Sequence, residues 1–250
     1  MKNNPFDLSG RRALVTGSSR GIGRAVALML ADFGAEVVVH GSCHGEKLRQ
    51  TVGDIQKSGG VSTGVAADIS SAEGLQTLIK ACGSVDIIVL NASVQSYQSV
   101  EDFTSEEFLR QYDINVRSSF ELVKAMLPGM KNRKWGRILS IGSVNQYKPS
   151  PRLAIYASTK AALMNLILNL ARQYAQYGIT ANNIAPGVIL TDRNEEILKD
   201  ENARGKLLQM IPSGRFGTGD DCTALALLLC SNAGSYITGA DIAVAGGMDL

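Results

Sequence analysis

Short apolar runs rich in β-branched residues alternate with longer helical patterns along the chain, and this alternation constrains the fold most strongly. Several runs, such as Ile87-Ile88-Val89 and Val37-Val38-Val39, are apolar at every position, so they would be buried on both faces. Strands of this kind, separated by helices, are typical of a parallel sheet between two helical layers. We predict strands at residues 12–16, 36–40, 61–66, 85–90, 137–141, 179–184 and 241–245.

No linker, repeat or low-complexity tract interrupts this alternation, so we interpret residues 1–250 as one domain. Of the 250 residues, 45% are hydrophobic, which is enough to build a sizeable core. Helix starts carry capping signals, as at Ser70-x-x-Glu73. The expected fold class is α/β, a single-domain, Rossmann-type, doubly wound, seven-stranded parallel sheet.

Charge, hydropathy and cysteine usage exclude several classes of protein. Twenty-five Lys and Arg against 23 Asp and Glu leave a net charge of +2, too small for the basic field that nucleic-acid binding requires. No apolar run approaches the ~18 residues of a membrane span, and segment 1–12 has no apolar signal core. We therefore expect a cytoplasmic protein with neither nucleic-acid nor membrane partners.

The sequence gives no sign of a disulfide framework or a metal site. The four cysteines are widely scattered and form no C-x-x-C pair. His40 and His44 have the spacing of a helical metal pair, but they begin at a strand end beside glycines, so their rings need not share a face. We predict no metal.

Three glycines lie in a turn between the first predicted strand and a helical pattern at 25–33, namely Gly17, Gly21 and Gly23. Without side chains, the backbone can approach a pyrophosphate, whose charge the start of the next helix favours. The spacing Gly-x-x-x-Gly-x-Gly differs from the common Gly-x-Gly-x-x-Gly, and such glycines can also serve close packing alone. Because strand, turn and helix follow directly, we favour a dinucleotide site.

The end of the second strand bears on which dinucleotide would bind. An acidic residue there would accept hydrogen bonds from the ribose 2′-hydroxyl and favour NAD, but the strand ends His40-Gly41-Ser42. Arg20 in the glycine turn, with Ser42 and either His40 or Lys47, could instead neutralise a 2′-phosphate. Arg20 could also be a solvated surface residue. We predict NADP (NADPH) as the cofactor, with NAD as the alternative.

Tyr156 and Lys160 lie four residues apart in the longest apolar-periodic segment, 153–177, so a helix would place them on one face. Ser140 and Ser143 follow the fifth predicted strand, at the edge of the sheet where open α/β folds bind ligands. The Tyr-x-x-x-Lys spacing alone is weak evidence. Apolar residues of segment 153–177 cover more than one helix face, and we expect the second face to contact another subunit.

Over essentially its whole length the chain resembles the classical short-chain dehydrogenase/reductase family. The motifs that carry the resemblance occur in the family's order: the glycine turn 16–23, Asp68, Asn91-Ala92, Asn115, Ser143, Tyr156-x-x-x-Lys160 and Pro186-Gly187. The chain departs from the family pattern at Leu90 and Ser93, where the family usually has asparagine and glycine. Ser93 therefore adds a side chain where the backbone would approach the cofactor.

The resemblance implies a catalytic role for four residues. Tyr156 would be the general acid in carbonyl reduction and the base in the reverse direction, and Lys160 would lower its pKa and bind the nicotinamide ribose. A charge at ~4 Å in an effective dielectric of ~20 supplies about 4 kcal/mol, enough to lower a phenol pKa from about 10 to about 7. Ser143 would hydrogen-bond the substrate oxygen. The backbone carbonyl of Asn115 would hold a water that connects Lys160 to solvent.

The same resemblance implies a set of cofactor contacts: Gly17, Ser19, Arg20, Gly21, Ile22, Gly23, Ser42, Asp68, Ile69, Asn91, Ala92, Tyr156, Lys160, Pro186, Gly187, Val188 and Thr191. Structural alternatives exist for several of these residues. Tyr156 and Lys160 could form a pair on a helix surface, and Ser143 could be a turn former. Asn115 could cap or break a helix, and Asp68 could be a turn residue.

Substrate choice should depend on segments 145–153 and 188–210, which flank the expected pocket. The first segment offers an amide, a phenol and two cations in Gln146, Tyr147, Lys148 and Arg152. This combination suits a small polar substrate of the sugar, polyol or sugar-acid type. We therefore predict an NAD(P)-dependent oxidoreductase that acts on CH-OH groups.

Two alternatives remain open. A 3-oxoacyl-acyl-carrier-protein reductase could dock its acidic partner on Arg133 and Arg137, but the arginine that these reductases commonly carry before Gly-Ile-Thr is Tyr177 here. A non-catalytic NADP-binding regulator would typically lack the tyrosine or the lysine, and this chain has both. The resemblance also implies a homotetramer, because most family members are tetrameric.

Overall fold

The structure, a computed structural model, describes residues 4–191 and 199–250. Residues 1–3 of the N-terminal segment and residues 192–198 of the expected substrate segment lie outside the described residues. The described strands are β1 (Arg12–Val15), β2 (Glu36–Gly41), β3 (Val61–Ala66), β4 (Ile87–Leu90), β5 (Gly136–Ile141), β6 (Ile179–Pro186) and β7 (Asp241–Val244). Both ends of every strand lie within two residues of the predicted ends.

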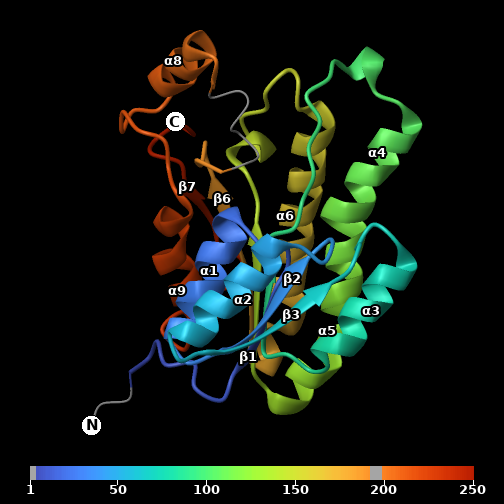
Figure 1. Cartoon of the computed structure of the whole chain (residues 1–250), viewed down its shortest axis with the longest axis vertical. Coiled ribbons are helices and arrows are strands. Elements are labelled where there is room, and N and C mark those ends of the chain that lie inside the picture. Colours follow the sequence, from blue (N-terminus) through green and yellow to red (C-terminus); the bar gives the residue numbers. More distant parts are fainter. Residues whose placement is uncertain (1–3, 192–198) are drawn as a thin grey trace.

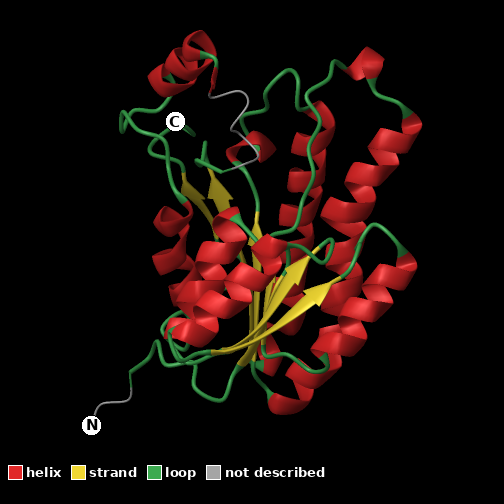
Figure 2. Ribbon diagram, in the orientation of Figure 1, coloured by secondary structure: helices red, strands yellow, loops and turns green. Residues whose placement is uncertain are grey.

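The seven strands form one sheet in the order β3-β2-β1-β4-β5-β6-β7, and every neighbouring pair is parallel. The predicted doubly wound parallel sheet is thereby confirmed (Figures 1 and 2). Strands β4, β5 and β6 are buried at every position, because helices cover both faces. Strand β3 lies at an edge of the sheet and has both exposed and buried positions.

Helices cover the sheet in two layers, each with its own apolar core. The first layer comprises α1 (Gly21–Asp32), α2 (Glu46–Lys57) and α9 (Thr223–Cys230). The second comprises α3 (Ala72–Cys82), α5 (Ser118–Arg133) and α6 (Ala154–Tyr174). Figure 1 shows the two groups on opposite sides of the strands. Within the described ranges, no helix has the length and apolarity needed to cross a bilayer.

Two further helices lie beside or beyond these layers: α4 (Ser105–Tyr112) and α8 (Glu201–Gln209). Short helical turns connect elements at Val100–Asp102, Asp113–Arg117, Val144–Gln146, Ala175–Tyr177 and Gly219–Cys222. The segment Asp113–Arg117 is a π-helix between α4 and α5, which the sequence pattern did not indicate. Such π segments often occur at functional sites.

Two details differ from the sequence prediction. The N-cap of α3 is Ser71 and not Ser70, because the Ser71 hydroxyl accepts a hydrogen bond from the Gly74 N–H at 3.0 Å. The backbone N–H of Ser70 is instead bound by the Asp68 carboxylate at 3.0 Å. The long helix α6 ends at Tyr174, and a 3-10 turn completes the predicted segment.

Because all strands are parallel, their carboxyl ends meet at one edge of the sheet. From β1 the chain adds β2 and β3 on one side of the sheet and then β4 to β7 on the other. The switch point therefore lies between β1 and β4. Open α/β sheets bind ligands in the crevice outside this switch point. In Figure 1, α8 lies beyond the carboxyl ends of β6 and β7, so the same edge is covered from above.

Candidate active site

A cavity of about 740 Å³ lies at the carboxyl edge of the sheet. Among the residues that line it are those predicted to contact a cofactor: Gly17, Ser19, Arg20, Gly21, Ile22, Ser42, Asp68, Ile69, Asn91, Ala92, Tyr156, Lys160, Pro186, Gly187, Val188 and Thr191. The predicted catalytic Ser143 lines the same cavity. Two predicted site residues, Gly23 and Asn115, do not line the cavity.

The glycine turn requires glycine at Gly17 for two physical reasons. Its backbone has φ = +63°, which side chains rarely adopt, and a Cβ there would lie 2.9 Å from the Ala92 Cα. Gly23 serves packing instead, because a Cβ would collide with the Asn91 side chain and the Gly17 carbonyl. The turn thus presents bare backbone to the cavity at Gly17, whereas at Gly23 it packs closely against neighbouring groups.

The side chain of Asn91 holds the glycine turn from the β4 side. Its Nδ2 donates hydrogen bonds to the carbonyls of Thr16 and Gly17 at 2.8 and 3.0 Å. The Thr16 hydroxyl in turn accepts from the backbone N–H groups of Asn91 and Ala92, both at 3.0 Å. β1 and β4 are therefore joined where they end, beside the cavity.

The structure changes the predicted set of 2′-phosphate contacts. Arg20 and Ser42 are exposed and both line the cavity. His40 is buried, and both of its ring nitrogens are already engaged in hydrogen bonds to backbone groups. Lys47 is the second residue of α2 and is not part of the cavity wall. His40 is therefore not available to bind a 2′-phosphate, whereas Arg20, Ser42 and Lys47 remain predicted contacts.

Asp68 is a turn residue, as the structural alternative predicted, and it also faces the cavity where the cofactor contact is expected. It lines the cavity, and its carboxylate accepts the Ser70 N–H at 3.0 Å, which shapes the turn before α3. This hydrogen bond stabilises the charged form and lowers the pKa of Asp68 below its ordinary value. The carboxylate is therefore an acceptor at neutral pH.

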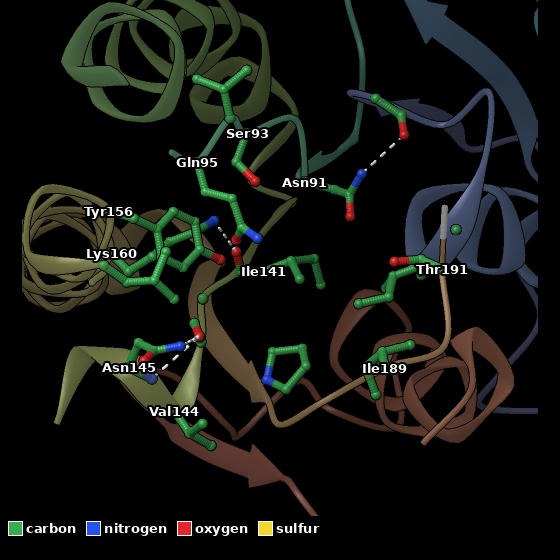
Figure 3. A pocket seen from close by; sticks show the side chains of 18 of the residues that line it. Asn91, Ser93, Gln95, Ile141, Val144, Asn145, Tyr156, Lys160, Ile189 and Thr191 are labelled. Atoms are coloured by element: carbon green, nitrogen blue, oxygen red, sulfur yellow. Dashed lines mark hydrogen bonds between the residues drawn. The ribbon is translucent and has the colours of Figure 1, made fainter. Parts of the chain in front are cut away.

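Tyr156 and Lys160 extend from α6 into the cavity wall and are almost fully buried, at 5% and 2% exposure. The Lys160 Nζ donates a hydrogen bond to the Ile141 carbonyl at 2.7 Å and lies 5.6 Å from the centre of the Tyr156 ring. Figure 3 shows the two side chains next to each other, with Thr191 and Ile189 across the cavity. A buried ammonium beside a phenol favours the phenolate.

Ser143 is oriented by the turn that follows β5. Its hydroxyl oxygen accepts hydrogen bonds from the backbone N–H and the side-chain Nδ2 of Asn145, both at 3.2 Å. Asn145 is itself held, because its Oδ1 accepts the Ser150 N–H at 3.1 Å. With both lone pairs engaged, the hydroxyl hydrogen of Ser143 is left for an acceptor in the cavity.

Asn115 occupies the π-helical segment and is fully buried. Its side chain accepts from the Val94 N–H at 2.8 Å and donates to the Val94 carbonyl at 2.9 Å and to the Thr159 hydroxyl at 3.0 Å. It therefore joins the loop after β4 to α6, next to Lys160. The sequence analysis considered its backbone carbonyl and a helix-capping or helix-breaking role, and it missed this function of the amide.

The loop after β5 contributes less charge to the cavity than the sequence suggested. Gln146 is directed to Asp241, to which its Nε2 donates at 2.7 Å, and neither Gln146, Tyr147 nor Arg152 lines the cavity. Lys148 does line it, but its Nζ donates to the carbonyls of Met248 and Leu250. The expectation of two cations facing the substrate is therefore wrong.

Several cavity residues lie outside both the predicted site residues and the predicted substrate segments: Val94, Gln95, Tyr97, Ile114 and Met248. Residues 94–97 follow shortly after β4, so their position after a central strand could have identified them. Met248 carries no such signal, because only the tertiary fold brings the end of the chain to the cavity. No cluster of three or more metal-ligating side chains occurs in the described ranges.

Known proteins resemble this chain in both sequence and structure. A family model described as Enoyl-(Acyl carrier protein) reductase matches residues 17–249. Glucose 1-dehydrogenase 2 of Bacillus subtilis (strain 168) is 37% identical over 250 residues, which cover 98% of this chain and 96% of that protein.

Two solved structures share the fold over almost their whole length. The 3-oxoacyl (acyl-carrier-protein) reductase from Agrobacterium tumefaciens C58 with NADP bound is 39% identical, with a TM-score of 0.92 and coverage of 97% and 96%. The gluconate 5-dehydrogenase from Burkholderia cenocepacia J2315 in complex with NADP and tartrate is 31% identical, with a TM-score of 0.91 and coverage of 98% and 97%. The chain belongs to the short-chain dehydrogenase/reductase family.

Proposed function

We propose that the protein is an NADP(H)-dependent oxidoreductase that interconverts a carbonyl and a secondary alcohol on a small polar substrate of the sugar, polyol or sugar-acid type. One observation carries this proposal. Ser143, Tyr156 and Lys160 line the same cavity as the glycine turn, with the Lys160 ammonium buried beside the Tyr156 ring. A hydrogen-bond donor, a proton donor and a cation thus meet where a dinucleotide fits.

The backbone of the cavity wall and the charge of its side chains both suit NADP(H). Gly17 and Gly21 leave bare backbone in the turn, where a side chain would fill the cradle. Arg20 and Ser42 supply a guanidinium and a hydroxyl that suit a 2′-phosphate, and both similar structures named above contain NADP. When bound, the nicotinamide supplies or accepts the hydride.

Tyr156 holds the proton that the carbonyl oxygen receives on reduction, and it takes that proton back in the reverse direction. An unperturbed phenol, with a pKa near 10, exchanges protons poorly at neutral pH. In this proposal the Lys160 ammonium, which is buried beside the ring, would stabilise the phenolate. The carbonyl of Ile141 satisfies one of the three Lys160 donors and places the ammonium.

Ser143 would donate its hydroxyl hydrogen to the substrate oxygen, where negative charge grows as hydride arrives. Asn145 supports this role, because its two N–H groups occupy the acceptor sites of the Ser143 oxygen. Asn115 would act through its side chain by keeping α6 in register with the loop after β4. The relay through a water at its backbone carbonyl remains part of the proposal.

Side chains beyond the catalytic group favour a small polar substrate. Asn145, Gln95 and Ser150 contribute amide and hydroxyl groups to the cavity wall, which suit a polyhydroxylated molecule. The similarity to glucose and gluconate dehydrogenases agrees with this chemistry.

The second candidate, a 3-oxoacyl-acyl-carrier-protein reductase, is favoured by the similarity to a solved reductase of that name. The expected docking arginines do not support it. Arg137 is buried and donates to the Ser231 carbonyl at 3.0 Å, and Arg133 pairs with Asp86 at 2.7 Å. Both lie at the amino end of β5, on the edge of the sheet opposite to the cavity.

We also propose a homotetramer in the cytoplasm. A groove of about 570 Å³ lies between α5 and α6 and is lined by apolar side chains such as Phe120, Leu127, Leu166 and Leu170. Phe120 is 44% exposed in the single chain, and a second copy would cover it. Light scattering should give about four times the 26.6 kDa chain mass, and a monomer at micromolar concentration would contradict the assembly.

A panel assay tests the proposed reaction. Purified protein is mixed with NADPH or NADH and with keto-sugars, keto-acids or acetoacetyl thioesters, and loss of reduced-nicotinamide absorbance is followed. We expect turnover of a keto-sugar or keto-acid with NADPH. Faster turnover of the thioesters would favour the reductase of acyl carrier protein substrates. Tight NADPH binding without turnover of any carbonyl would indicate a regulator.

The cofactor preference has its own test with a matched control. Arg20→Ala should raise the KM for NADPH and leave the KM for NADH nearly unchanged, because only NADPH carries the 2′-phosphate. Arg49→Ala is the control, because Arg49 is an exposed residue of α2 that does not line the cavity. Equal efficiency of the wild-type protein with both cofactors would contradict the role of Arg20.

A further inference from the structure

His40 is a buried titratable side chain that the proposed chemistry does not use. It ends the run of valines in β2 and is only 2% exposed. Its Nδ1 accepts a hydrogen bond from the Gly17 N–H at 3.1 Å, and its Nε2 lies 2.9 Å from the Ala67 carbonyl oxygen. A backbone N–H can only donate and a carbonyl can only accept, so the ring is neutral with its hydrogen on Nε2.

The two hydrogen bonds of the ring join two separate parts of the cavity wall. Gly17 belongs to the glycine turn after β1, and Ala67 immediately precedes Asp68 and Ile69 after β3. β2 lies between β1 and β3 in the sheet, so its last side chain is the one that can reach both. The ring thereby sets the separation of the two walls.

The backbone of Gly17 is held through both of its polar groups. The His40 ring accepts its N–H, and Asn91 donates to its carbonyl at 3.0 Å. Gly17 has a positive φ and no side chain, so other contacts restrict its backbone little. A turn that is ordered before binding loses less conformational entropy when a ligand arrives.

The sheet itself does not depend on the ring. Backbone hydrogen bonds connect Ser18 N–H to the His40 carbonyl and Ala67 N–H to the Gly41 carbonyl, both at 2.9 Å. The His40 N–H donates to the Ser18 hydroxyl at 2.9 Å. Replacement of the ring therefore removes the connection between the turn and the β3–α3 loop and leaves these strand-end bonds in place.

We propose that His40 is a positioning residue for the cofactor site: its neutral ring holds the glycine turn and the β3–α3 loop at the spacing that NADP(H) requires, although neither ring nitrogen binds the cofactor. This inference rests on the proposed placement of NADP(H) along Gly17 and Asp68. It assigns to His40 a function in cofactor affinity and none in the chemical step.

Two conservative variants separate the two hydrogen bonds. The amide of His40→Asn reaches the Nδ1 position, so it can accept from Gly17 but not donate to Ala67. The longer amide of His40→Gln reaches the Nε2 position and keeps only the bond to Ala67. His40→Leu removes both bonds, and His44→Asn, at the exposed second histidine, is the matched control.

NADPH affinity is measured by fluorescence titration without substrate, followed by KM and kcat for the best carbonyl substrate. A net hydrogen bond contributes about 0.5–1.5 kcal/mol, so each amide variant should raise the NADPH Kd about 2- to 10-fold. His40→Leu should raise it more than either, and kcat at saturating NADPH should stay within about twofold of wild type. His44→Asn should match wild type.

The outcomes distinguish this inference from the proposed function. If wild-type protein does not bind NADPH, the proposed function fails. If wild type binds but all three His40 variants bind equally well, or if kcat falls while Kd does not change, the positioning role is overturned. If His40→Leu does not fold, the Asn and Gln variants decide alone: unchanged affinity in both overturns the inference, and weaker binding with unchanged kcat supports it.

Discussion

The two halves of the cavity are built in different ways. The half around the glycine turn is formed by the ends of β1, β2 and β4. Asn91 donates a hydrogen bond to the Gly17 carbonyl there, and the Gly17 N–H donates to the His40 ring. The half around Asn145 is formed by loops that single side chains hold, as in the hydrogen bonds from Lys148 to the Met248 and Leu250 carbonyls at 3.0 and 2.7 Å.

This difference indicates where the fold tolerates substitutions. A hydrogen bond between strand ends is supported by the whole sheet, so its geometry is set before any ligand arrives. A loop held by side-chain contacts such as that of the exposed Lys148 does not have the support of the sheet, and loops accept substitutions that strand ends do not. We therefore expect the first half to bind one cofactor and the second half to determine the substrate.

The largest expected effect is at the border between the halves. Tyr156→Phe removes the proton donor and keeps the ring in place, so kcat should fall by about 10²- to 10⁴-fold. The NADPH Kd should stay close to wild type, because the hydroxyl acts on the substrate oxygen. Steady-state kinetics and NADPH titration of the same preparation check both. Retained turnover would rule out Tyr156 as the proton donor.

The second-largest effect should be a loss of cofactor binding that is confined to the cofactor half of the cavity. Gly17→Ala places a side chain at φ = +63° and 2.9 Å from the Ala92 Cα, a strain of about 1–3 kcal/mol. We expect NADPH binding to weaken by about 10- to 100-fold, as measured by titration.

Gly53→Ala is the matched control for this glycine. Gly53 lies in α2, where an added Cβ meets nothing within 4 Å. Alanine there should stabilise the protein by roughly 0.5–1 kcal/mol, because glycine is unfavourable inside a helix. If Gly17→Ala bound NADPH as well as Gly53→Ala does, the cavity would not use the backbone of the glycine turn.

A smaller effect should appear in the substrate half. Lys148→Met releases the carbonyls of Met248 and Leu250 and loosens the wall of the cavity. The KM for the carbonyl substrate should rise about 3- to 10-fold, while the NADPH Kd remains unchanged, as expected for loss of hydrogen bonds from a charged donor. Lys80→Met, at an exposed position of α3, is the control. A change in NADPH affinity without a change in substrate KM would contradict the division into halves.

The smallest effect is a pH dependence that belongs to the cofactor half. Burial lowers the pKa of His40 below its ordinary value of 6.5, although the Ala67 carbonyl and the nearby Asp68 charge act in the opposite direction. The unfolded chain therefore takes up this proton at a higher pH than the folded one. The stability contributed by neutral His40 is present above 6.5 and decreases as the pH falls below it.

Urea denaturation between about pH 5 and pH 8 measures this dependence. His40→Gln should remove part of the decrease in stability at low pH, and His44→Asn should leave the profile unchanged. If the wild type and His40→Gln lost stability in parallel over this range, His40 would not be a buried neutral histidine. Protonation would also place two donors, the ring and the Gly17 N–H, against each other.

Local sequence patterns were sufficient for the sheet and for the order of the site motifs. The all-apolar runs in β2 and β4 specify strands buried on both faces, and the Tyr156 to Lys160 spacing specifies one helix face. Both follow from the periods of strand and helix, which are properties of consecutive residues. The resemblance to a family then added the roles that spacing alone could not supply.

Other contacts depend on residues that are distant in the chain. The sequence placed His40 at a strand end, but only the tertiary structure directed both ring nitrogens to backbone groups just after β1 and β3. Arg137 lies one residue into β5 and carries no local sign that it would be buried against the Ser231 carbonyl. Lys148 likewise meets the Leu250 carbonyl only because the chain returns to the cavity. Sequence period determines which residues form an element, whereas the direction in which a polar side chain finds its partner depends on how those elements pack.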